Sequence, residues 1–308
     1  MLAIVIPYYK LTFFEATLRS LANQTDKRFK VYIGDDASPE NPTNLLEKYK
    51  GLFEFVYHRF DSNLGGISLV KQWERCVAMI GDEEWVMILG DDDYLEKNVV
   101  ASWHENYRIF NKKANVIRFA SKIVNEVLGV ISNTFRHPKF ENAGDSWFRK
   151  SKGKTRSSLS EYIFSKESYR LFGFKNYPLA WHSDDRIWLD FANGKPIYTI
   201  NESNVFIRES NSSISGKQDN KDLKYIAKLQ FLKDIIFEKL QIFNKKQRLE
   251  LLLDYEVKIK WVRKLTLKEW FFMFQFYLKN FSIIPFLKLI RRFLISLGLI
   301  SRSSASNE

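Results

Sequence analysis

The chain has 308 residues, of which 45% are apolar and 16% aromatic, with only 13 Gly and 7 Pro. This composition is typical of a globular protein with a sizeable core, and it excludes extensive disorder. Cys76 is the only cysteine, which excludes an intrachain disulfide and the cysteine clusters of zinc modules. A reducing, cytoplasmic setting is therefore expected.

The net charge of +12 is unevenly distributed along the chain. Residues 1–220 contain 30 Lys and Arg against 28 Asp and Glu, whereas residues 221–308 contain 18 against 8. A basic partner surface is therefore expected in the C-terminal part, while the N-terminal part is close to neutral and carries local acidic clusters.

The first 90 residues alternate between short apolar runs and helical patterns. The runs predict strands at Leu2–Pro7, Phe29–Ile33, Phe53–Tyr57 and Trp85–Leu89. The patterns between them predict helices at Phe13–Asn23, Thr43–Tyr49 and Ile67–Met79. Such alternation predicts parallel strand pairing and an α/β layered fold. The opening run has no basic leader and no small-residue cleavage site, so we interpret it as a strand and not as a signal peptide.

Further elements are predicted on both sides of a long polar segment. Before it, a helix is expected at Asn98–Phe110 and a strand at Asn115–Phe119. The segment itself, residues 133–160, is rich in Ser, Lys and Gly and is interpreted as a loop or mobile lid. After it, we predict helices at Lys166–Leu171 and Trp181–Ala192 and a short strand at Pro196–Ile200. The composition turns polar again around residues 210–220, and we place a domain boundary there, between residues 1–215 and 216–308.

The C-terminal part predicts helices, with heavy Lys and Glu content over Leu223–Leu253 and an amphipathic pattern beyond it. Apolar residues recur at helical spacing at Ile283, Phe286, Leu287, Ile290, Phe293, Leu294 and Leu297. Lys288, Arg291 and Arg292 are expected on the opposite side. No run of about 20 uncharged residues could span a bilayer. The tail is interpreted either as a basic helix lying in an anionic membrane interface or as a bundle packed on the core, and its aromatic density favours the membrane.

Chemically capable side chains follow three of the predicted strands. These are Tyr8-Tyr9-Lys10, Asp35-Asp36 and Asp91-Asp92-Asp93. In open parallel sheets, ligands collect beyond the carboxyl ends of the strands. Three adjacent carboxylates repel one another, and a divalent cation that bridges them to phosphate oxygens would offset this repulsion. The alternative for this cluster is a solvated acidic turn.

Three other motifs allow both a functional and a structural interpretation. Asp36 could accept a hydrogen bond from a nucleoside, or it could belong to a turn capped by Ser38. The glycines after Asn63 permit close approach of a ligand, although a simple turn is the default. Asp184 and Asp185 begin a predicted helix, where they could act as a general base or merely complement the helix dipole.

Taken in order, these motifs resemble those of family 2 glycosyltransferases of the GT-A fold over about residues 1–215. The opening strand with Pro7 and Tyr9 looks like that family's "VIPTYN" segment, and residues 35–38 look like its "DDxS" motif. Residues 63–65 are similar to its "NxG" loop, and residues 89–93 to its "DxDD" metal motif. Asp184, four residues before Trp188, matches the aspartate of its "ED" motif.

The resemblance implies a Rossmann-like, mostly parallel sheet flanked by helices and an inverting transfer from a nucleotide-diphosphate sugar. It assigns the nucleobase to Asp36, the nucleoside frame to the backbone at Pro7 and Tyr9, and the donor loop to Asn63. Asp93 would bind Mg²⁺ or Mn²⁺, and Asp92 would contact the ribose or the donor sugar. Asp184 would be the catalytic base. The implied acceptor is a glycan or lipid-linked oligosaccharide for bacterial surface polysaccharide, at the inner face of the cell membrane.

The sequence departs from the family pattern at several of these positions. Lys10 replaces the usual Asn, and Gly90 stands where many members have the first Asp of the metal motif. Ser183-Asp184-Asp185 replaces Glu-Asp, so Asp185 is a second candidate for the base. Lys71-Gln72-Trp73 replaces the usual Arg-Asn. Arg208 is a candidate diphosphate contact from a closing loop, or else a surface arginine.

The sequence disfavours three rival functions. A sugar nucleotidyltransferase would need a glycine-rich, Arg-containing loop after the first strand, where this chain has Tyr8–Phe13. An inactive GT-A-like binding module is disfavoured by the retained Asp36, Asp93 and Asp184. Nucleic-acid binding by the basic tail is disfavoured by its interleaved large aliphatic residues, and no nucleic-acid partner is expected.

Overall fold

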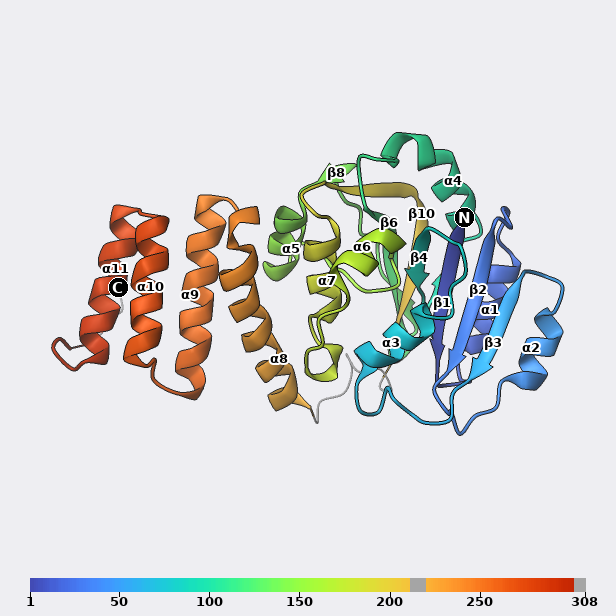
Figure 1. The fold of residues 1–308 in the computed structure, drawn as a ribbon, viewed down its shortest axis with the longest axis horizontal. Coiled ribbons are helices and arrows are strands. Elements are labelled where there is room, and N and C mark those ends of the chain that lie inside the picture. Colours follow the sequence, from blue (N-terminus) through green and yellow to red (C-terminus); the bar gives the residue numbers. More distant parts are fainter. Residues whose placement is uncertain (211–219, 302–308) are drawn as a thin grey trace. The chain divides into compact units, whose positions relative to one another are not determined.

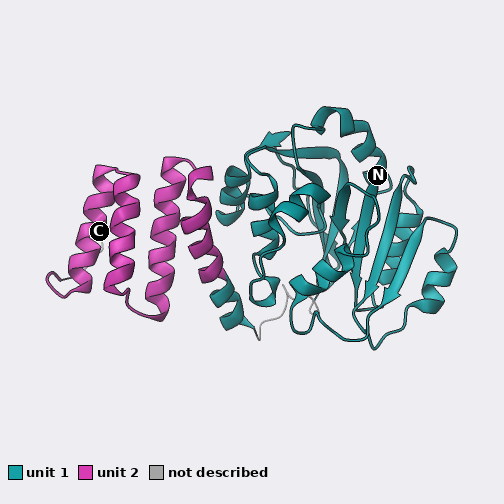
Figure 2. Cartoon of the chain, viewed as in Figure 1, with its two compact units in different colours: residues 1–227 teal, residues 228–308 magenta. Residues whose placement is uncertain are grey.

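A computed structural model of the chain describes residues 1–210 and 220–301. The chain divides into two compact units, residues 1–227 and residues 228–308 (Figure 2). The boundary predicted between residues 215 and 216 lies outside the described residues.

The first unit is built on one sheet whose first half is parallel. Strands β3 (Phe55–Arg59), β2 (Phe29–Asp35), β1 (Leu2–Tyr8) and β4 (Trp85–Ile88) lie in this order and in parallel register. They are joined by helices α1 (Phe14–Ala22), α2 (Thr43–Tyr49) and α3 (Leu69–Val77), which flank the strands in Figure 1. Strands β1 and β4 are buried on both faces, which is why they are continuous apolar runs in the sequence. The predicted α/β architecture is confirmed.

The second half of the sheet is mixed in direction. Strand β9 (Tyr162–Ser165) lies antiparallel between β4 and β6 (Val116–Asn125), and β10 (Ile197–Glu209) runs parallel to β6. Short strands complete this half: β5 (Tyr94–Leu95), β7 (Val130–Ile131) and β8 (Phe140–Glu141). The helices of this half are α4 (Val99–Phe110), α5 (Ala143–Ser151), α6 (Lys166–Phe172), α7 (Ser183–Phe191) and the 3₁₀ turn Pro178–Ala180.

Two faces of the sheet carry different helices. One face forms the main core, where the even-numbered residues of β1 pack against α1 through Phe14, Leu18 and Leu21 and against α4 through Trp103. The opposite face packs against α3, whose Cys76 side chain lies against Gly34. Phe164 of β9, on that same opposite face, packs on Phe191 of α7 with ring centroids 5.1 Å apart. Helix α7 is therefore anchored on β9, which lies next to β4 in the sheet.

Two predictions about the middle of the chain are wrong in detail. The segment 133–160 is not a plain loop, because it contains β8 and α5. Helix α5 begins because the Asn142 side chain accepts a hydrogen bond from Gly144 N at 2.8 Å, and it is held by the buried Trp147. The strand predicted at Pro196–Ile200 continues to Glu209, past a register irregularity between Ile200 and Asn204.

The second unit is helical. Helix α8 (Lys221–Asp234) leads into it through a π turn (Ile235–Lys239) and a 3₁₀ turn (Leu240–Ile242), and it is followed by α9 (Lys245–Val262), α10 (Leu267–Lys279) and α11 (Ile283–Ser296). The single helical pattern predicted over Leu223–Leu253 is therefore interrupted. The interruption ends where Asn244 and Gln247 form a reciprocal capping box that starts α9. None of the helices in the described parts of the chain is both long and apolar enough to cross a bilayer.

The predicted position of Arg292 on the last helix is wrong. Arg292 was expected on the wet side with Lys288 and Arg291, but it points inward to Glu256, whose carboxylate is fully buried. Its Nε and terminal nitrogen donate to the two Glu256 oxygens at 2.8 and 2.9 Å, and it also donates to the Tyr277 hydroxyl at 3.3 Å. A buried carboxylate must be paired, so this arginine is fixed by α9 rather than by the periodicity of its own helix.

Candidate functional site

The carboxyl ends of β2, β1 and β4 are joined by hydrogen bonds at one edge of the sheet. The backbone N–H of Asp36 donates to Tyr8 O at 3.0 Å. The next residues of the β1 end, Tyr9 and Lys10, donate their N–H groups to Asp91 Oδ2 at 2.7 and 2.8 Å. The three predicted motifs, residues 8–10, 35–36 and 91–93, therefore meet at this edge of the sheet.

The aspartates that follow β4 are not equivalent. Asp91 holds the end of β1 through the two bonds just described. Asp93 is buried, and its Oδ1 accepts the backbone N–H of Arg208 at 2.8 Å. The Thr17 hydroxyl of α1 lies within hydrogen-bond distance of the carbonyl oxygens of Asp91 and Asp93, at 3.1 and 2.7 Å. These contacts fix the backbone, and they leave Asp92 and Asp93 as the carboxylates of this turn that could meet a ligand.

The acidity of this cluster is strongly perturbed. Burial, together with the charge of Asp92, raises the pKa of Asp91 to about 6 and that of Asp93 to about 7. Burial also raises the pKa of Asp92. Three crowded carboxylates that are costly to ionise form an electrostatic site that a cation would stabilise.

The residues present fit a cation of the Mg²⁺ type that shares its coordination with phosphate. Over the described parts of the chain, no three His, Cys, Asp or Glu side chains are grouped so that they could hold a metal by themselves. Mg²⁺ does not require such a cage, because it commonly binds through one or two carboxylates together with substrate phosphates and water.

The structure gives a steric reason for Gly90 at the position where many family members have the first Asp of the metal motif. A Cβ at this position would lie 2.9 Å from Asp92 Oδ1 and 3.2 Å from Asp93 Oδ2. A larger residue, including the aspartate that many family members have here, would therefore displace both carboxylates. Because Gly90 has no side chain, the carboxylates of Asp92 and Asp93 can lie close to its backbone.

Asp36 and Asn63 shape the loop after β3. Asp36 accepts hydrogen bonds from Leu64 N at 2.7 Å and Gly65 N at 2.9 Å, and it pairs with Arg75. The Asn63 side chain accepts the N–H of Gly66 at 2.6 Å, and this bond fixes the backbone of the two glycines. The structure thus brings Asp36 to the loop that contains Asn63, and the contact of either residue with a donor stays a prediction.

The neighbouring Asp35 belongs to a network that sequence reasoning missed. Its fully buried carboxylate accepts hydrogen bonds from the Tyr57 hydroxyl at 2.6 Å and from Arg59 at 2.9 Å. Burial and this carboxylate raise the pKa of Tyr57 to about 12. The one available signal was the alternation of Tyr57 and Arg59 along β3, which places both on the same face.

Arg208 is neither on a closing loop nor a surface arginine. It lies in β10, and its side chain is 9% exposed. The guanidinium lies 4.2 Å from the ring centre of Phe13, donates to Asp92 O at 2.8 Å and pairs with Glu126. The extension of β10 beyond Ile200 is what carries Arg208 to the aspartate turn.

The candidate bases Asp184 and Asp185 differ in their environments. Asp185 accepts hydrogen bonds from Lys150 Nζ at 2.6 Å and from His182 Nδ1 at 2.7 Å. Burial opposes its ionisation, but the Lys150 charge and the His182 bond prevail and lower the pKa of Asp185 to about 2. Burial raises the pKa of Asp184, with Lys150 opposing the rise. Asp185 is thus held ionised by fixed partners, whereas Asp184 keeps the higher proton affinity that a general base needs.

Helix α7 is tied to the same edge of the sheet as the aspartate turn. Trp188, one turn beyond Asp184, stacks on Tyr162 with ring centroids 4.0 Å apart. Tyr162 begins β9, and Ser160, two residues earlier, accepts the N–H of Gly90 at 3.0 Å. The strand that supports α7 therefore also contacts the turn that carries Asp93.

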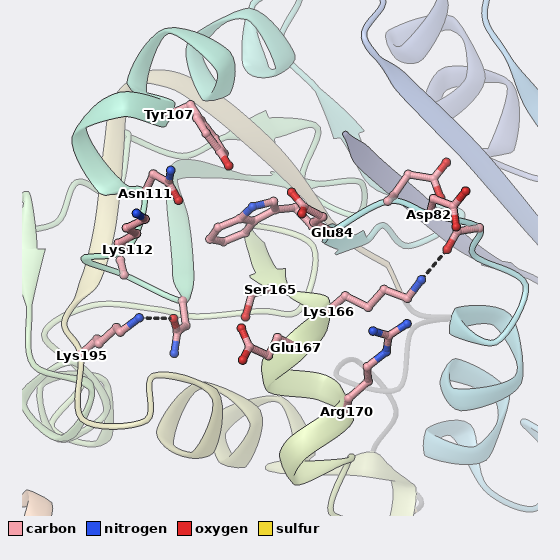
Figure 3. Close-up of a pocket in the computed structure, with 15 residues that line it drawn as sticks. Asp82, Glu84, Tyr107, Asn111, Lys112, Ser165, Lys166, Glu167, Arg170 and Lys195 are labelled. Carbon is pink, nitrogen blue, oxygen red and sulfur yellow. Dashed lines mark hydrogen bonds between the residues drawn. The ribbon is translucent and has the colours of Figure 1, made fainter.

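A separate cavity of about 780 Å³ lies at the opposite edge of the sheet (Figure 3). It includes Trp85, the first residue of β4, whereas the aspartates follow the last residue of that strand. Its lining mixes both charges, including Asp82, Glu167 and Arg170. This cavity shares no residue with the aspartate turn, and ligands of such sheets bind at the other edge.

The Lys150–Asp185 pair gives a stability prediction. Lys150→Met leaves the buried Asp185 carboxylate without its cation, and we expect a loss of about 3 kcal/mol in the free energy of unfolding. Urea denaturation at neutral pH measures the loss. Lys150→Arg, which keeps the charge, is the matched control and should lose much less. Equal midpoints for the wild type and Lys150→Met would contradict the pairing.

Residues 3–152 match the model of "Glycosyl transferase family 2". A search of curated proteins gives no match. The chain is similar in structure to S. aureus TarS 1-349 in complex with UDP-GlcNAc, with a TM-score of 0.64, 15% sequence identity, and coverage of 96% of this chain and 81% of that chain. For the same TarS segment in complex with UDP, the TM-score is 0.58 and the identity 16%, with 92% and 82% coverage. At these identities the likeness shows the fold.

Proposed function

Because residues 3–152 match the model of glycosyl transferase family 2, we propose that the chain is a transferase of this family and moves a sugar from a nucleotide-diphosphate sugar to a hydroxyl group. One observation carries the proposal: the carboxyl ends of β1, β2 and β4 meet at one edge of the sheet, and Asp93 is buried there next to Asp91 and Asp92. A polyanionic donor bound together with a cation matches the charge of such an edge.

In this proposal Asp93 holds Mg²⁺ or Mn²⁺, and Asp92 contacts the ribose or the donor sugar. The cation, when bound, neutralises charge that develops on the departing diphosphate. Asp36 and the backbone at Pro7 and Tyr9 frame the nucleoside, and the loop of Asn63 lies beside them. Arg208 adds positive charge next to Asp92, where its guanidinium is already oriented by Phe13.

Asp184 is the proposed general base, and Asp185 is a positioning residue. A base takes the proton of the acceptor hydroxyl as the oxygen attacks the anomeric carbon, and direct displacement inverts that carbon. Burial raises the pKa of Asp184, which gives it a higher proton affinity than Asp185. Asp185 is bound by Lys150 and His182, and these contacts fix the first turn of α7.

The donor class draws support from the structural neighbours, since TarS is recorded in complex with UDP-GlcNAc and with UDP. A UDP-sugar is therefore the first donor to test. We further propose a glycan or lipid-linked acceptor for surface polysaccharide, reached at the cytoplasmic face of a membrane that the basic second unit contacts. The amphipathic helix α11 and the excess of Lys and Arg beyond residue 220 support this contact.

A panel of nucleotide sugars tests the function. We expect one UDP-sugar to bind with Mn²⁺ and to lose most of its affinity in EDTA, as measured by calorimetry, and we expect slow hydrolysis of the bound donor. Binding without hydrolysis or transfer would favour an inactive binding module. Release of diphosphate from a nucleoside triphosphate and a sugar phosphate would favour a nucleotidyltransferase. Binding of none of the nucleotide sugars would overturn the proposal.

A further inference from the structure

The second unit contains a cavity of about 630 Å³ lined by α9, the end of α10 and the start of α11. Leu249 and Leu253 of α9 and Ile284 and Pro285 of α11 supply its apolar wall. Tyr277, which is 2% exposed, and Arg292 also line it. The volume is in the range of pockets that hold small amphiphilic ligands.

Three exposed lysines border this apolar wall. Lys245 and Lys246 begin α9, and Lys288 lies on α11. Arg292 also lines the cavity, but its guanidinium is bound inward to Glu256, which pairs with Lys260 as well, so the exposed charge of the rim comes from the lysines. Glu250 is the one acidic residue of the lining, and residues 270–301 contain no Asp or Glu at all. The cavity thus has an apolar wall and a rim of net positive charge.

The first turns of α11 carry large apolar side chains into solvent beside the cavity. Ile283, Ile284 and Leu287 are 64%, 65% and 58% exposed. They occupy adjacent turns of one helix, so they form one apolar surface next to Lys288. An exposed apolar surface rimmed by one sign of charge is typical of a site for an amphiphile of the opposite charge.

We infer that this cavity, with the surface of Ile283, Ile284 and Leu287, binds an acidic phospholipid of a membrane surface. The phosphate meets Lys245, Lys246 and Lys288, and acyl carbons cover the apolar wall. The inference deepens the membrane contact of the proposed function and rests on it. A second copy of the same surface fits poorly, because a symmetric dimer would bring two lysine rims of net positive charge together, with one acidic residue, Glu250, in each lining.

Vesicle binding with two charge-matched double variants tests the site. Co-sedimentation uses phosphatidylcholine vesicles with about 30 mol% phosphatidylglycerol, and pure phosphatidylcholine as the blank. Lys246→Glu/Lys288→Glu alters the cavity rim, and Lys264→Glu/Lys268→Glu makes the same charge change at exposed positions of the same unit that do not line it. We expect the rim variant to lose at least about 30-fold in affinity and the control no more than about 3-fold. Equal losses would mean diffuse attraction and would overturn the site.

A soluble lipid below its micelle concentration provides the second measurement. Dihexanoyl phosphatidylglycerol should bind the full chain with one-to-one stoichiometry by calorimetry, and Ile284→Asp should abolish that binding without lowering the thermal midpoint, because Ile284 is exposed. No binding of the monomeric lipid, or a lipid-free dimer that the same substitution dissociates, would overturn the inference. Mn²⁺-dependent donor binding by the same variants reports separately on the proposed function, since none of these residues belongs to the first unit.

Discussion

Asp184→Asn is expected to lower transfer by about 10³-fold while leaving the affinity for the nucleotide sugar within a factor of about three. The amide keeps the size of the side chain but cannot take the proton of the acceptor hydroxyl, so the loss falls on the chemical step. Steady-state transfer and calorimetric donor binding, measured on the same preparation, separate the two effects. Transfer should persist at a low residual rate, because positioning of the donor is unchanged.

Asp185→Asn is the informative companion of this variant. It breaks contacts with Lys150 and His182, so its main cost is expected in unfolding free energy, with a smaller loss of transfer than in Asp184→Asn. Normal transfer by Asp184→Asn together with a dead Asp185→Asn would move the base to Asp185. Normal transfer by both would place the base elsewhere.

Asp93→Asn is expected to abolish the part of donor binding that depends on Mn²⁺, a loss of at least about 100-fold in affinity. The amide removes the negative charge at the most buried of the three aspartates, while its oxygen can still accept the N–H of Arg208. Calorimetry with and without EDTA measures the loss. The residual affinity in EDTA should equal that of the wild type in EDTA.

Protons should compete with the cation at this site. Burial raises the pKa of Asp93 to about 7, so its carboxylate is largely protonated below that pH and largely ionised above it. Mn²⁺ should therefore raise the thermal midpoint of the wild type more at about pH 8 than at about pH 6, and this difference should vanish in Asp93→Asn. Asp82→Asn, an exposed aspartate at the opposite edge of the sheet, is the matched control. An unchanged metal response in Asp93→Asn would remove Asp93 from the cation site.

Local pattern was sufficient for the parallel half of the sheet. The strands β1, β2 and β4 are apolar runs buried on both faces, and the helices between them begin and end within two residues of their predicted limits. The aspartates after β4 were found for the same reason, since a charged cluster directly behind a buried strand stands out in one dimension. Family resemblance then supplied the roles that such a pattern cannot supply.

Elements that depend on distant partners were missed. Strand β9 has only four residues, follows a polar stretch and has no periodicity of its own. It forms because its backbone pairs antiparallel with β4 on one side and β6 on the other. The extension of β10 beyond Ile200 also depends on a distant partner, since residues 204–209 pair with residues 120–125 of β6. Helix α5 was hidden in a segment whose average composition is that of a loop.

The sequence by itself determined the α/β class, the order of the motifs and the helical nature of the C-terminal part, because spacing between near neighbours is enough to decide these. Tertiary structure alone decided which charges are buried. Arg292 follows the pattern of a surface residue, yet it turns inward to Glu256, 36 positions earlier. Asp185 differs from Asp184 because it binds His182 and also Lys150, which is 35 positions away. The free energy of a buried charge depends on its partner, and periodicity contains no information about a partner on another helix.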